Sequence, residues 1–382
     1  MEVIFLIGSV QAIFLAILVF NKRPKSTADY ILGVWMIFIG FHLLYYYLRT
    51  IGFLNEHPHL LGIGFAFPQL EAPFMFVYVL LVMKKDSKFR LAYLLHGIPF
   101  LITTTYLCFD FYFLSGAEKI AYYELIYTDL PLDVEIIAFP NIIMSPVYVI
   151  WSLIKLRQHS KNIAQEFSYT EKINLNWLKI LIGGLGFIAV TVVVSNILVK
   201  YPILSVEMHE HLNYLAVTIT VFLMGYFGIK QQAIYKQSPI QSSVVPKSNT
   251  VKKKGSGERY SHSGLKKEEA QSHLQELKEY FEKEQPYLNG KLSLPDVATK
   301  INITPNHLSQ VINEQLEMTF YDFVNRYRVE EIKSRLADSK NQQFTLLAIA
   351  FDCGFNSKSS FNAIFKKFTD LTPSQFSAQL RN

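Results

Sequence analysis

Apolar and polar positions divide the chain into two unequal parts. Up to residue 230, apolar stretches of helix length alternate with short polar connections, whereas polar residues dominate beyond residue 231. A helix needs about 20 predominantly apolar residues to cross a hydrocarbon core of ~30 Å. Seven stretches are long enough, so the pattern predicts an all-α protein that begins with a seven-helix transmembrane bundle. The predicted spans are Val3 to Phe20, Tyr30 to Leu48, Leu60 to Met83, Leu91 to Phe109, Val134 to Ile154, Trp177 to Val199 and Leu212 to Ile229.

Basic residues mark every second connection between these spans. Because basic loops stay on the cytoplasmic side, the alternation predicts a multi-pass protein of the cytoplasmic (inner) membrane, with its N-terminus outside and its C-terminus inside. The alternative is the buried all-helical core of a soluble protein, which rarely needs seven uncharged runs of this length. The first, third and fifth loops carry Lys22, Arg23, Lys25, Lys84, Lys85, Lys88, Arg90, Lys155, Arg157, Lys161 and Lys172. The intervening loops carry Arg49, Lys119 and Lys200.

Composition narrows the classes of protein further. Apolar residues make up 50% of the chain and charged residues 18%, and the formal net charge of +6 is too small to indicate nucleic-acid binding by itself. The two cysteines, Cys108 and Cys353, fall in different halves and cannot build a disulfide framework or a metal cluster. The first apolar run is too long for a signal peptide and is followed by basic residues, so we interpret it as the first span.

One acidic residue in the third predicted span is a candidate signal site. Glu71 lies close to the middle of that stretch, between Pro68 and Pro73. An ionisable side chain at mid-membrane costs at least ~2.5 kcal/mol on insertion scales, which makes it a functional candidate by default. The alternative is a Glu71 that is protonated, or that pairs with a neighbouring span for packing alone. Interhelical hydrogen bonding is the expected role of His42, His96, Asn141 and Asn196.

A polar segment separates the apolar part from the C-terminal part. Residues 237 to 264 are rich in Ser, Pro, Lys and Gly, and such a composition cannot bury enough apolar surface to fold. Its lysine run, Lys252 to Lys254, is either solvated or bound to acidic lipid headgroups. The stretch from Leu265 to Glu284 then predicts an amphipathic helix, because Leu277 and Phe281 recur at helical spacing.

A helix-turn-helix pattern follows after Lys291. Ser293 and Asp296 form a capping-box pattern before a short helix, and Asn302 tolerates the positive φ that a turn requires. Thr304 and Pro305 open the next helix as N-cap and first-turn proline. Amide and imidazole groups on the outer face of that helix are suited to base edges in the major groove. The outward residues are Asn306, His307, Gln310 and Asn313.

A connecting helix from about Thr319 to Ala337 leads to a second pattern of the same kind. At ~1.5 Å per residue it spans roughly 28 Å, comparable to the ~34 Å between successive major grooves. The second pattern begins at Thr345, turns at Gly354, and predicts a recognition helix from Ser357 to Phe368 without an acidic residue. Lysines on such a face suit phosphate contacts, and an ordinary solvated face is the alternative. The outward residues are Lys358, Ser359, Asn362, Lys366 and Lys367.

The string LLAIAFDCGFNSKSSFNAIFKKFTDLTPSQF, from Leu346 to Phe376, resembles the second helix-turn-helix of the AraC/XylS family of transcription regulators. Upstream, LSLPDVATKINITPNHLSQVINEQLEMTFYDFVNRYRVEEIKSRL is similar to the first helix-turn-helix and connecting helix of that family. The resemblance covers about Tyr287 to Gln379, and the apolar part resembles, more loosely, the seven-span sensor regions of some members. The chain departs from the family at Ala348, Ile332 and Asp370, where an acidic residue, an alanine and a glycine are usual. The resemblance implies base contacts from Asn306, His307, Gln310 and Asn313, and base or phosphate contacts from Lys358, Asn362, Lys366 and Lys367.

Together these observations predict three parts: a membrane sensor domain over 1–230, a flexible linker over 231–264 and a cytoplasmic AraC-type DNA-binding domain over 265–382. The predicted function is that of a membrane-bound one-component transcription regulator, which binds promoter DNA in response to a signal at the membrane. The expected partners are double-stranded promoter DNA, the lipid bilayer, RNA polymerase, a second copy of the chain and an unidentified signal ligand. No cofactor and no metal are expected.

Two other classes of protein are alternatives to this prediction. A seven-span receptor or transporter could carry a tail that binds another protein, although outward amides and basic recognition helices favour DNA. An enzyme embedded in the membrane would need paired mid-span aspartates or a similar catalytic set, and the aspartates of the apolar part lie in loops or at span ends. The polar part has no phosphate-binding glycine loop and no kinase motif set.

Overall fold

The structure is a computed structural model that describes residues 2–83, 88–128, 131–169, 175–201, 203–236, 267–341 and 343–381. Within these ranges the chain is helical, with an isolated antiparallel bridge between Phe167 and Ser293. The prediction of an all-α fold is confirmed. The chain forms two compact units. The first unit comprises Met1–Arg157 and Leu175–Ser242, and the second comprises Gln158–Asn174 and Ser243–Asn382.

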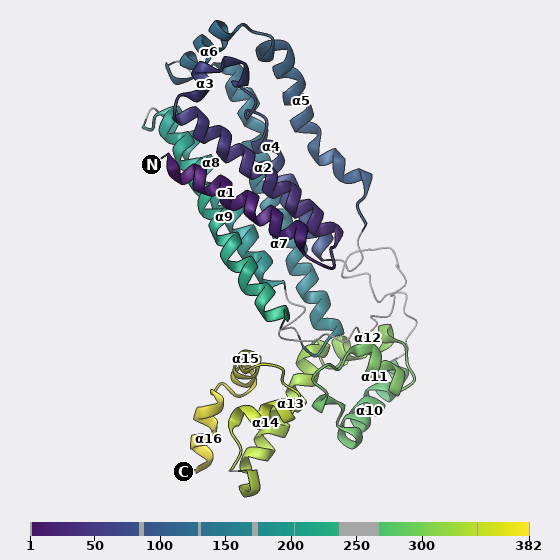
Figure 1. Cartoon of the computed structure of the whole chain (residues 1–382). Helices are drawn as coiled ribbons and strands as arrows, with labels where there is room; N and C mark the ends of the chain where they lie inside the picture. Colours follow the sequence, from purple (N-terminus) through teal and green to yellow (C-terminus); the bar gives the residue numbers. More distant parts are fainter. Residues whose placement is uncertain are drawn as a thin grey trace. The chain divides into compact units, whose positions relative to one another are not determined.

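The first unit is built from long helices, of which α1, α2, α8 and α9 run side by side (Figure 1). Its helices are α1 (Val3–Asn21), α2 (Thr27–Thr50), α3 (Phe53–Glu56), η1 (Pro58–Leu60), α4 (Pro68–Val82), η2 (Leu91–Gly97), α5 (Ile98–Leu107), the π-helix η3 (Cys108–Tyr112), α6 (Gly116–Thr128), α7 (Leu132–Glu166), α8 (Asn176–Lys200) and α9 (Val206–Lys236). The residues of α7 after Arg157 belong to the second unit.

Five apolar helical stretches among the described residues are long enough to cross a membrane. They are α1, α2, the continuous run Leu91–Tyr112, α7 and most of α8, with mean hydropathies from 1.4 to 2.7. Each contains or closely matches one of the predicted spans. The seventh predicted span falls within α9, and its side chains beyond Tyr226 lie outside the described residues.

The third predicted span, Leu60 to Met83, is wrong in its length and start. The helix α4 begins only at Pro68 and has 15 residues, or ~22 Å at 1.5 Å per residue. Residues 61–67 form turns, because Gly62 adopts a left-handed φ of 85° and its N–H donates to the Tyr45 hydroxyl at 2.9 Å. Glu71 therefore lies in the first turn of a short helix, not in the middle of a long one.

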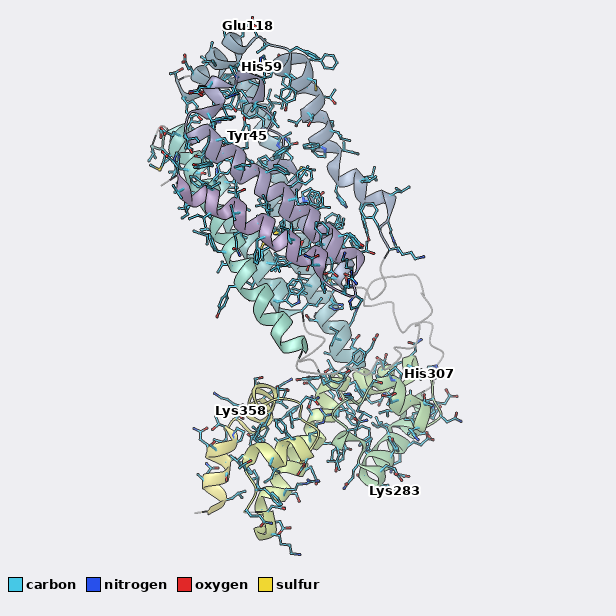
Figure 2. All side chains as sticks on the ribbon, in the orientation of Figure 1. Tyr45, His59, Glu118, Lys283, His307 and Lys358 are labelled. Atoms are coloured by element: carbon cyan, nitrogen blue, oxygen red, sulfur yellow. The ribbon has the colours of Figure 1, made fainter. Side chains whose placement is uncertain are left out.

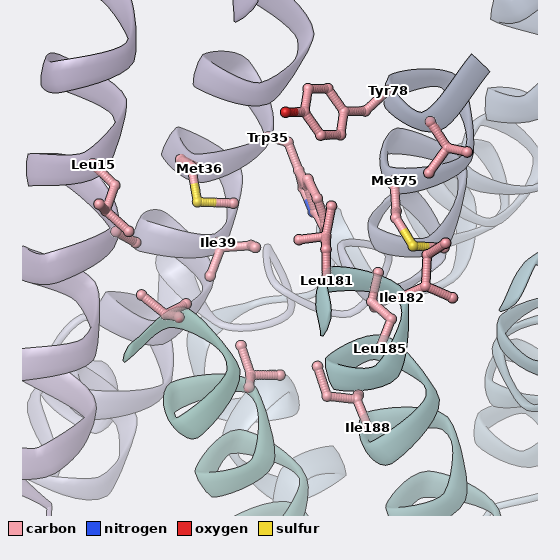
Figure 3. Packing of buried hydrophobic residues seen from close by; sticks show 14 of the residues in the cluster. Leu15, Trp35, Met36, Ile39, Met75, Tyr78, Leu181, Ile182, Leu185 and Ile188 are labelled. Atoms are coloured by element: carbon pink, nitrogen blue, oxygen red, sulfur yellow. The ribbon is translucent and has the colours of Figure 1, made fainter. Parts of the chain in front are cut away.

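Apolar side chains fill the interior of the first unit and also cover its outside. In Figure 3, Trp35 and Met36 of α2 pack with Met75 of α4 and Leu181 of α8. On the outside, only 11% of the apolar window of α7 is buried, and Phe109 at the end of the Leu91–Tyr112 run is 81% exposed. A continuous apolar surface of this kind is a liability in water, whereas hydrocarbon is its matching solvent.

The second unit contains shorter helices with an amphipathic pattern. The predicted linker lies outside the described residues from residue 237 to its end, and its first residues end α9. The helix predicted from Leu265 is confirmed from Lys267 onward. The helices of this unit are α10 (Lys267–Glu284), η4 (Pro286–Leu288), α11 (Leu294–Lys300), α12 (Pro305–Gln315), α13 (Phe320–Ala337), η5 (Ser339–Asn341), α14 (Leu346–Asp352), α15 (Lys358–Thr369) and α16 (Pro373–Arg381).

Two apolar cores lie at either end of α13. The first core joins α10, α11, α12 and the N-terminal half of α13, including Phe320 and Val324. The second core joins α14, α15, α16 and the C-terminal half of α13, including Val329 and Ile332. We call α11 with α12 the upstream motif and α14 with α15 the downstream motif. Because α13 belongs to both cores, it fixes the spacing of the two motifs.

Candidate functional site

The upstream motif forms as the sequence predicts. The side chains of Ser293 and Asp296 make the capping box that opens α11, and the Thr304 hydroxyl accepts from the His307 N–H at 3.2 Å to cap α12. Between the helices, Asn302 adopts a φ of 55°, the left-handed conformation that asparagine tolerates. Ala298 is fully buried, so its small side chain lets the two helices approach closely.

The outer face of α12 is only partly accessible. Asn306 is exposed, and His307 and Asn313 are half-buried. Gln310 is 7% exposed, so its predicted outward exposure is wrong. The position is two residues after the core residue Leu308, hence about 200° around the helix from it. Its amide donates to Glu314 at 3.0 Å, so the side chain lies along α12 instead of extending away from it.

The downstream motif presents its predicted residues openly. Ser357 caps α15, and Lys358, Ser359, Asn362, Lys366 and Lys367 are all exposed. Lys367 is partly neutralised, because its ammonium lies 2.6 Å from the Asp322 carboxylate of α13. Figure 2 labels one residue of each recognition helix, His307 and Lys358, and both lie along the same edge of the second unit, opposite Lys283.

Two turns of the downstream motif use left-handed backbone. Gly354 has a φ of 89°, and a Cβ there would lie 2.5 Å from the Tyr287 carbonyl oxygen and 2.9 Å from the Arg328 Nε. Glycine is therefore required both for conformation and for space. Asp370 ends α15 with a φ of 59°, so it adopts the conformation for which glycine is usual in the resembling family. Aspartate visits this region more readily than most residues, which explains why the departure is tolerated.

Two buried polar residues at the middle of α13 were missed by sequence reasoning. Asn325 and Arg328 are each 1% exposed. The Arg328 guanidinium donates to the carbonyl oxygens of Tyr287 at 2.7 Å and Asn289 at 2.8 Å, which tie α13 to the segment before the upstream motif. A spacing signal was present, since Arg328 lies four residues after Val324, on the face that reaches the core.

The candidate signal residue Glu71 belongs to a chain of hydrogen bonds within the first unit. Its Oε1 lies 3.0 Å from the Nδ1 of His42 on α2, and the His42 Nε2 lies 2.9 Å from the hydroxyl of Tyr214 on α9. Tyr214 stacks on Tyr46, whose hydroxyl reaches His211 Nδ1 at 2.9 Å. The N-terminus of α4 also favours a negative charge at this position. Glu71 is therefore paired with a neighbouring helix, and the chain links α4, α2 and α9.

The weaker polar candidates divide into two kinds. His42 and His96 bond between helices, the second through Nδ1 to the Tyr148 hydroxyl at 2.7 Å. Asn141 and Asn196 make contacts within their own helices, Asn141 accepting from Ser145 and Asn196 donating to the Val192 carbonyl. Interhelical bonding is thus confirmed for the two histidines. For the asparagines, the hydrogen bonds that the structure gives are local.

Among the described residues, no group of three or more His, Cys, Asp or Glu side chains could hold a metal ion. The Cys353 thiol lies in the second core, where burial raises its pKa to about 12. Such a thiol is inert, because the thiolate is the reactive form.

Residues 297–379 match the family model described as a helix-turn-helix domain. The chain is 35% identical over 90 residues to an uncharacterised HTH-type transcriptional regulator of Staphylococcus aureus, covering 24% of this chain and 12% of that protein. It is 27% identical over 93 residues to the uncharacterised HTH-type transcriptional regulator YtdP of Bacillus subtilis, covering 24% and 12% of the two chains. It is 25% identical over 85 residues to the melibiose operon regulatory protein of Escherichia coli, covering 22% and 27%.

The chain thus spans about an eighth of the length of the first of these relatives. No solved structure matches it. These likenesses identify an AraC-type helix-turn-helix domain at the C-terminus.

Proposed function

We propose that the protein is a membrane-bound one-component transcription regulator whose first unit senses a signal and whose second unit binds promoter DNA. The observation that carries the proposal is the combination, in one chain, of a double helix-turn-helix domain and helices with apolar outer surfaces. A DNA-binding domain that is tethered to a bilayer can convert an event at the membrane into a change in transcription. The regulator works as a homodimer, as the paired half-sites of helix-turn-helix proteins suggest. RNA polymerase is a further proposed partner.

DNA binding is supported by the chemistry of the two recognition helices. Base edges are distinguished by hydrogen bonds to amides, and Asn306 offers one in the upstream motif. Phosphates are held by cations, and Lys358 and Lys366 offer two in the downstream motif. The connecting helix α13 holds these faces in one rigid unit. The upstream motif therefore supplies sequence preference, and the downstream motif supplies more of the general affinity.

The test is a titration of the full-length chain, reconstituted in lipid nanodiscs, against a selected library of duplexes at several salt concentrations. We expect a preferred sequence and an affinity that falls linearly with salt on logarithmic axes. Binding that lacks both sequence preference and salt dependence would contradict the proposal. Capture of a protein by the same nanodiscs would then favour a receptor with a protein-binding tail.

We propose seven spans with the N-terminus outside, because the alternating basic loops favour this topology and it places the second unit in the cytoplasm. Reporter fusions after Lys25, Arg90, Lys161 and Gln237 should report cytoplasm. Fusions near Glu56, Glu118 and Met208 should report the exterior. An exterior position for Gln237 would put the DNA-binding domain out of reach of DNA.

Glu71 is the proposed point at which the signal acts. Its hydrogen bonds to His42, and through His42 to Tyr214, join three helices that a signal could rearrange. Glu71→Gln keeps the shape and removes the ionisation, so we expect it to lock or abolish the response of a reporter promoter to pH and inducer. Glu56→Gln, an exposed carboxylate of α3, is the matched control. A Glu71→Gln variant that responds like the parent would make the residue structural only.

A further inference from the structure

The second unit includes a piece of chain from between two predicted spans. Residues 158–169 follow Arg157 of the first unit, and the described part ends in Phe167 and Ser168, directly after α7. Phe167 pairs with Ser293 in an antiparallel bridge immediately before α11. We call residues 167–168 the docking segment.

Ser168 is bound through all of its polar groups. Its N–H donates to the Leu292 carbonyl at 3.1 Å, and its hydroxyl donates to the same oxygen at 2.7 Å. Its carbonyl accepts from Arg328 at 3.0 Å and from Asn325 at 3.3 Å, while its hydroxyl also accepts from Arg328 at 3.2 Å. The residue is 1% exposed. A serine that is this completely satisfied occupies a specific site and is not a loop residue lying on a surface.

The receiving site is made of two buried polar side chains that face the docking segment. A guanidinium has five N–H donors, and each terminal nitrogen of Arg328 donates one hydrogen bond to Ser168. Without the segment, those two donors would lose their protein acceptors. A buried donor without an acceptor costs free energy. Arg328 therefore stabilises the docked segment wherever water cannot take the place of Ser168.

The same arginine lies where the two motifs meet. It bonds the Tyr287 and Asn289 carbonyls ahead of the upstream motif, and its guanidinium lies 5.9 Å from the ring centre of Phe355 in the downstream motif. The docking segment is therefore attached to the residue that joins both motifs. A displacement of the segment would change the bonding of Arg328 and, with it, the junction between the motifs.

Resting on the proposed function, we infer that the docking segment is the intramolecular partner of the DNA-binding unit and that its release controls DNA binding. In the same conformation Gln310 is buried and its amide donates to Glu314, so it does not present its amide to a base. The docked state is accordingly assigned as the weaker DNA-binding state. A signal that moves the end of α7 frees the segment and raises the affinity.

The test locks the segment in the full-length chain with a disulfide. Phe167→Cys and Ser293→Cys place thiols on a bridge pair, whose Cα separation of about 4.5–5.5 Å suits a disulfide. Of the two native cysteines, Cys108 is removed by Cys108→Ser. Cys353 can stay, because burial raises its pKa to about 12 and keeps the thiol inert. A protease site inserted between residues 237 and 266 separates the two cysteines along the chain. After oxidation in membranes and cleavage, a docked chain remains one species in a non-reducing gel.

We expect near-complete crosslinking of this pair. The control pair, Lys161→Cys with Ser293→Cys, should crosslink little, because residue 161 lies six residues before Phe167, or roughly 9 Å along the helix axis of α7. Oxidation should weaken binding of the preferred duplex by about tenfold, the size expected for one base contact. Reduction should restore the affinity. The single variant Ser293→Cys, which carries the altered helix cap alone, should show no response to oxidation.

A second variant tests the hydrogen bonds themselves. Ser168→Ala removes the hydroxyl that bonds Leu292 and Arg328, so it should lower the crosslinking yield and strengthen DNA binding by a few-fold. Failure of the pair to crosslink, or complete crosslinking with unchanged DNA affinity, would overturn the inference. If no form of the chain prefers any duplex, the proposed function fails, while the crosslinking result still decides whether the segment is docked.

Discussion

The two helix-turn-helix motifs share a backbone design but differ in what they expose. Both use a small buried residue, a left-handed turn residue and a hydroxyl that caps the second helix: Ala298, Asn302 and Thr304 upstream, with Ala350, Gly354 and Ser357 downstream. The upstream recognition helix carries amides, one of which is buried. The downstream helix carries lysines, and all of its predicted contact residues are exposed.

This difference indicates a division of labour within one rigid domain. In the proposed function the motif next to the docking segment distinguishes sequences, so regulation there would change specificity. In the same proposal the other motif, whose lysines are exposed, contacts phosphates of any sequence. Regulation of the upstream motif alone would therefore leave a weak, general affinity for DNA.

The largest expected effect breaks the junction between the motifs. Gly354→Ala should cost about 2 to 4 kcal/mol, because the left-handed φ and the 2.5 Å approach to the Tyr287 oxygen are both incompatible with a Cβ. The rate at which a thiol reagent labels Cys353 in the full-length Cys108→Ser chain measures opening of the second core. Gly290→Ala is the control, since its Cβ would meet mainly the movable side chain of Asn356. Equal labelling of the two variants would contradict this account of the junction.

The next effect concerns sequence preference. Asn306→Ala should relax discrimination by ~1–3 kcal/mol at one or two positions of the upstream half-site, because a base contact is lost. A duplex library titrated against the full-length variant measures it. Gln315→Ala, at the exposed end of α12, should leave the preferred sequence unchanged. A uniform loss across all duplexes would assign Asn306 to phosphate contact instead.

The helix caps should behave alike in the two motifs. Thr304→Ala and Ser357→Ala each remove a hydroxyl that accepts an N–H, from His307 at 3.2 Å and from Ser360 at 3.1 Å. Each should lower the stability of the second unit by about 1 kcal/mol. Denaturant unfolding followed by near-ultraviolet circular dichroism compares them. If the two losses of unfolding free energy differ by more than about twofold, the two caps are not equivalent in their local structure.

The smallest effect separates two neighbouring lysines. Lys366→Ala should reduce the logarithmic salt slope of DNA binding by about 1, the value for one phosphate contact. Lys367→Ala should reduce it less, because Asp322 already pairs with Lys367 at 2.6 Å. Asp322→Asn frees that lysine and should steepen the slope. Equal slopes for both lysine variants would mean that the ion pair is broken when DNA binds.

Local signals in the sequence were sufficient for most of the second unit. Caps at Ser293 and Thr304 and the turn at Asn302 follow from short-range hydrogen bonding and φ preferences, which depend on a few adjacent residues. The apolar spacing likewise predicted α13, with Phe320 and Ile332 in its buried face.

Contacts between distant segments were not predictable in the same way. The apolar spacing within α12 predicted an exposed Gln310, because that spacing describes one helix alone and not the groups that pack around it. Ser168 lies 160 residues before Arg328, and no local pattern signals that they meet. In the first unit, hydropathy could not reveal that the third apolar run begins with turns at Gly62 and becomes helical only at Pro68.

In the proposed function, the intact, membrane-held chain occupies specific promoter sites. The most direct measurement is crosslinking in cells that produce the full-length chain, followed by separation of membrane and soluble fractions and sequencing of the DNA bound in each. We expect discrete promoter sites that copurify with full-length protein in the membrane fraction. Bound DNA without discrete sites, or discrete sites found only with a soluble fragment of the chain, would contradict it.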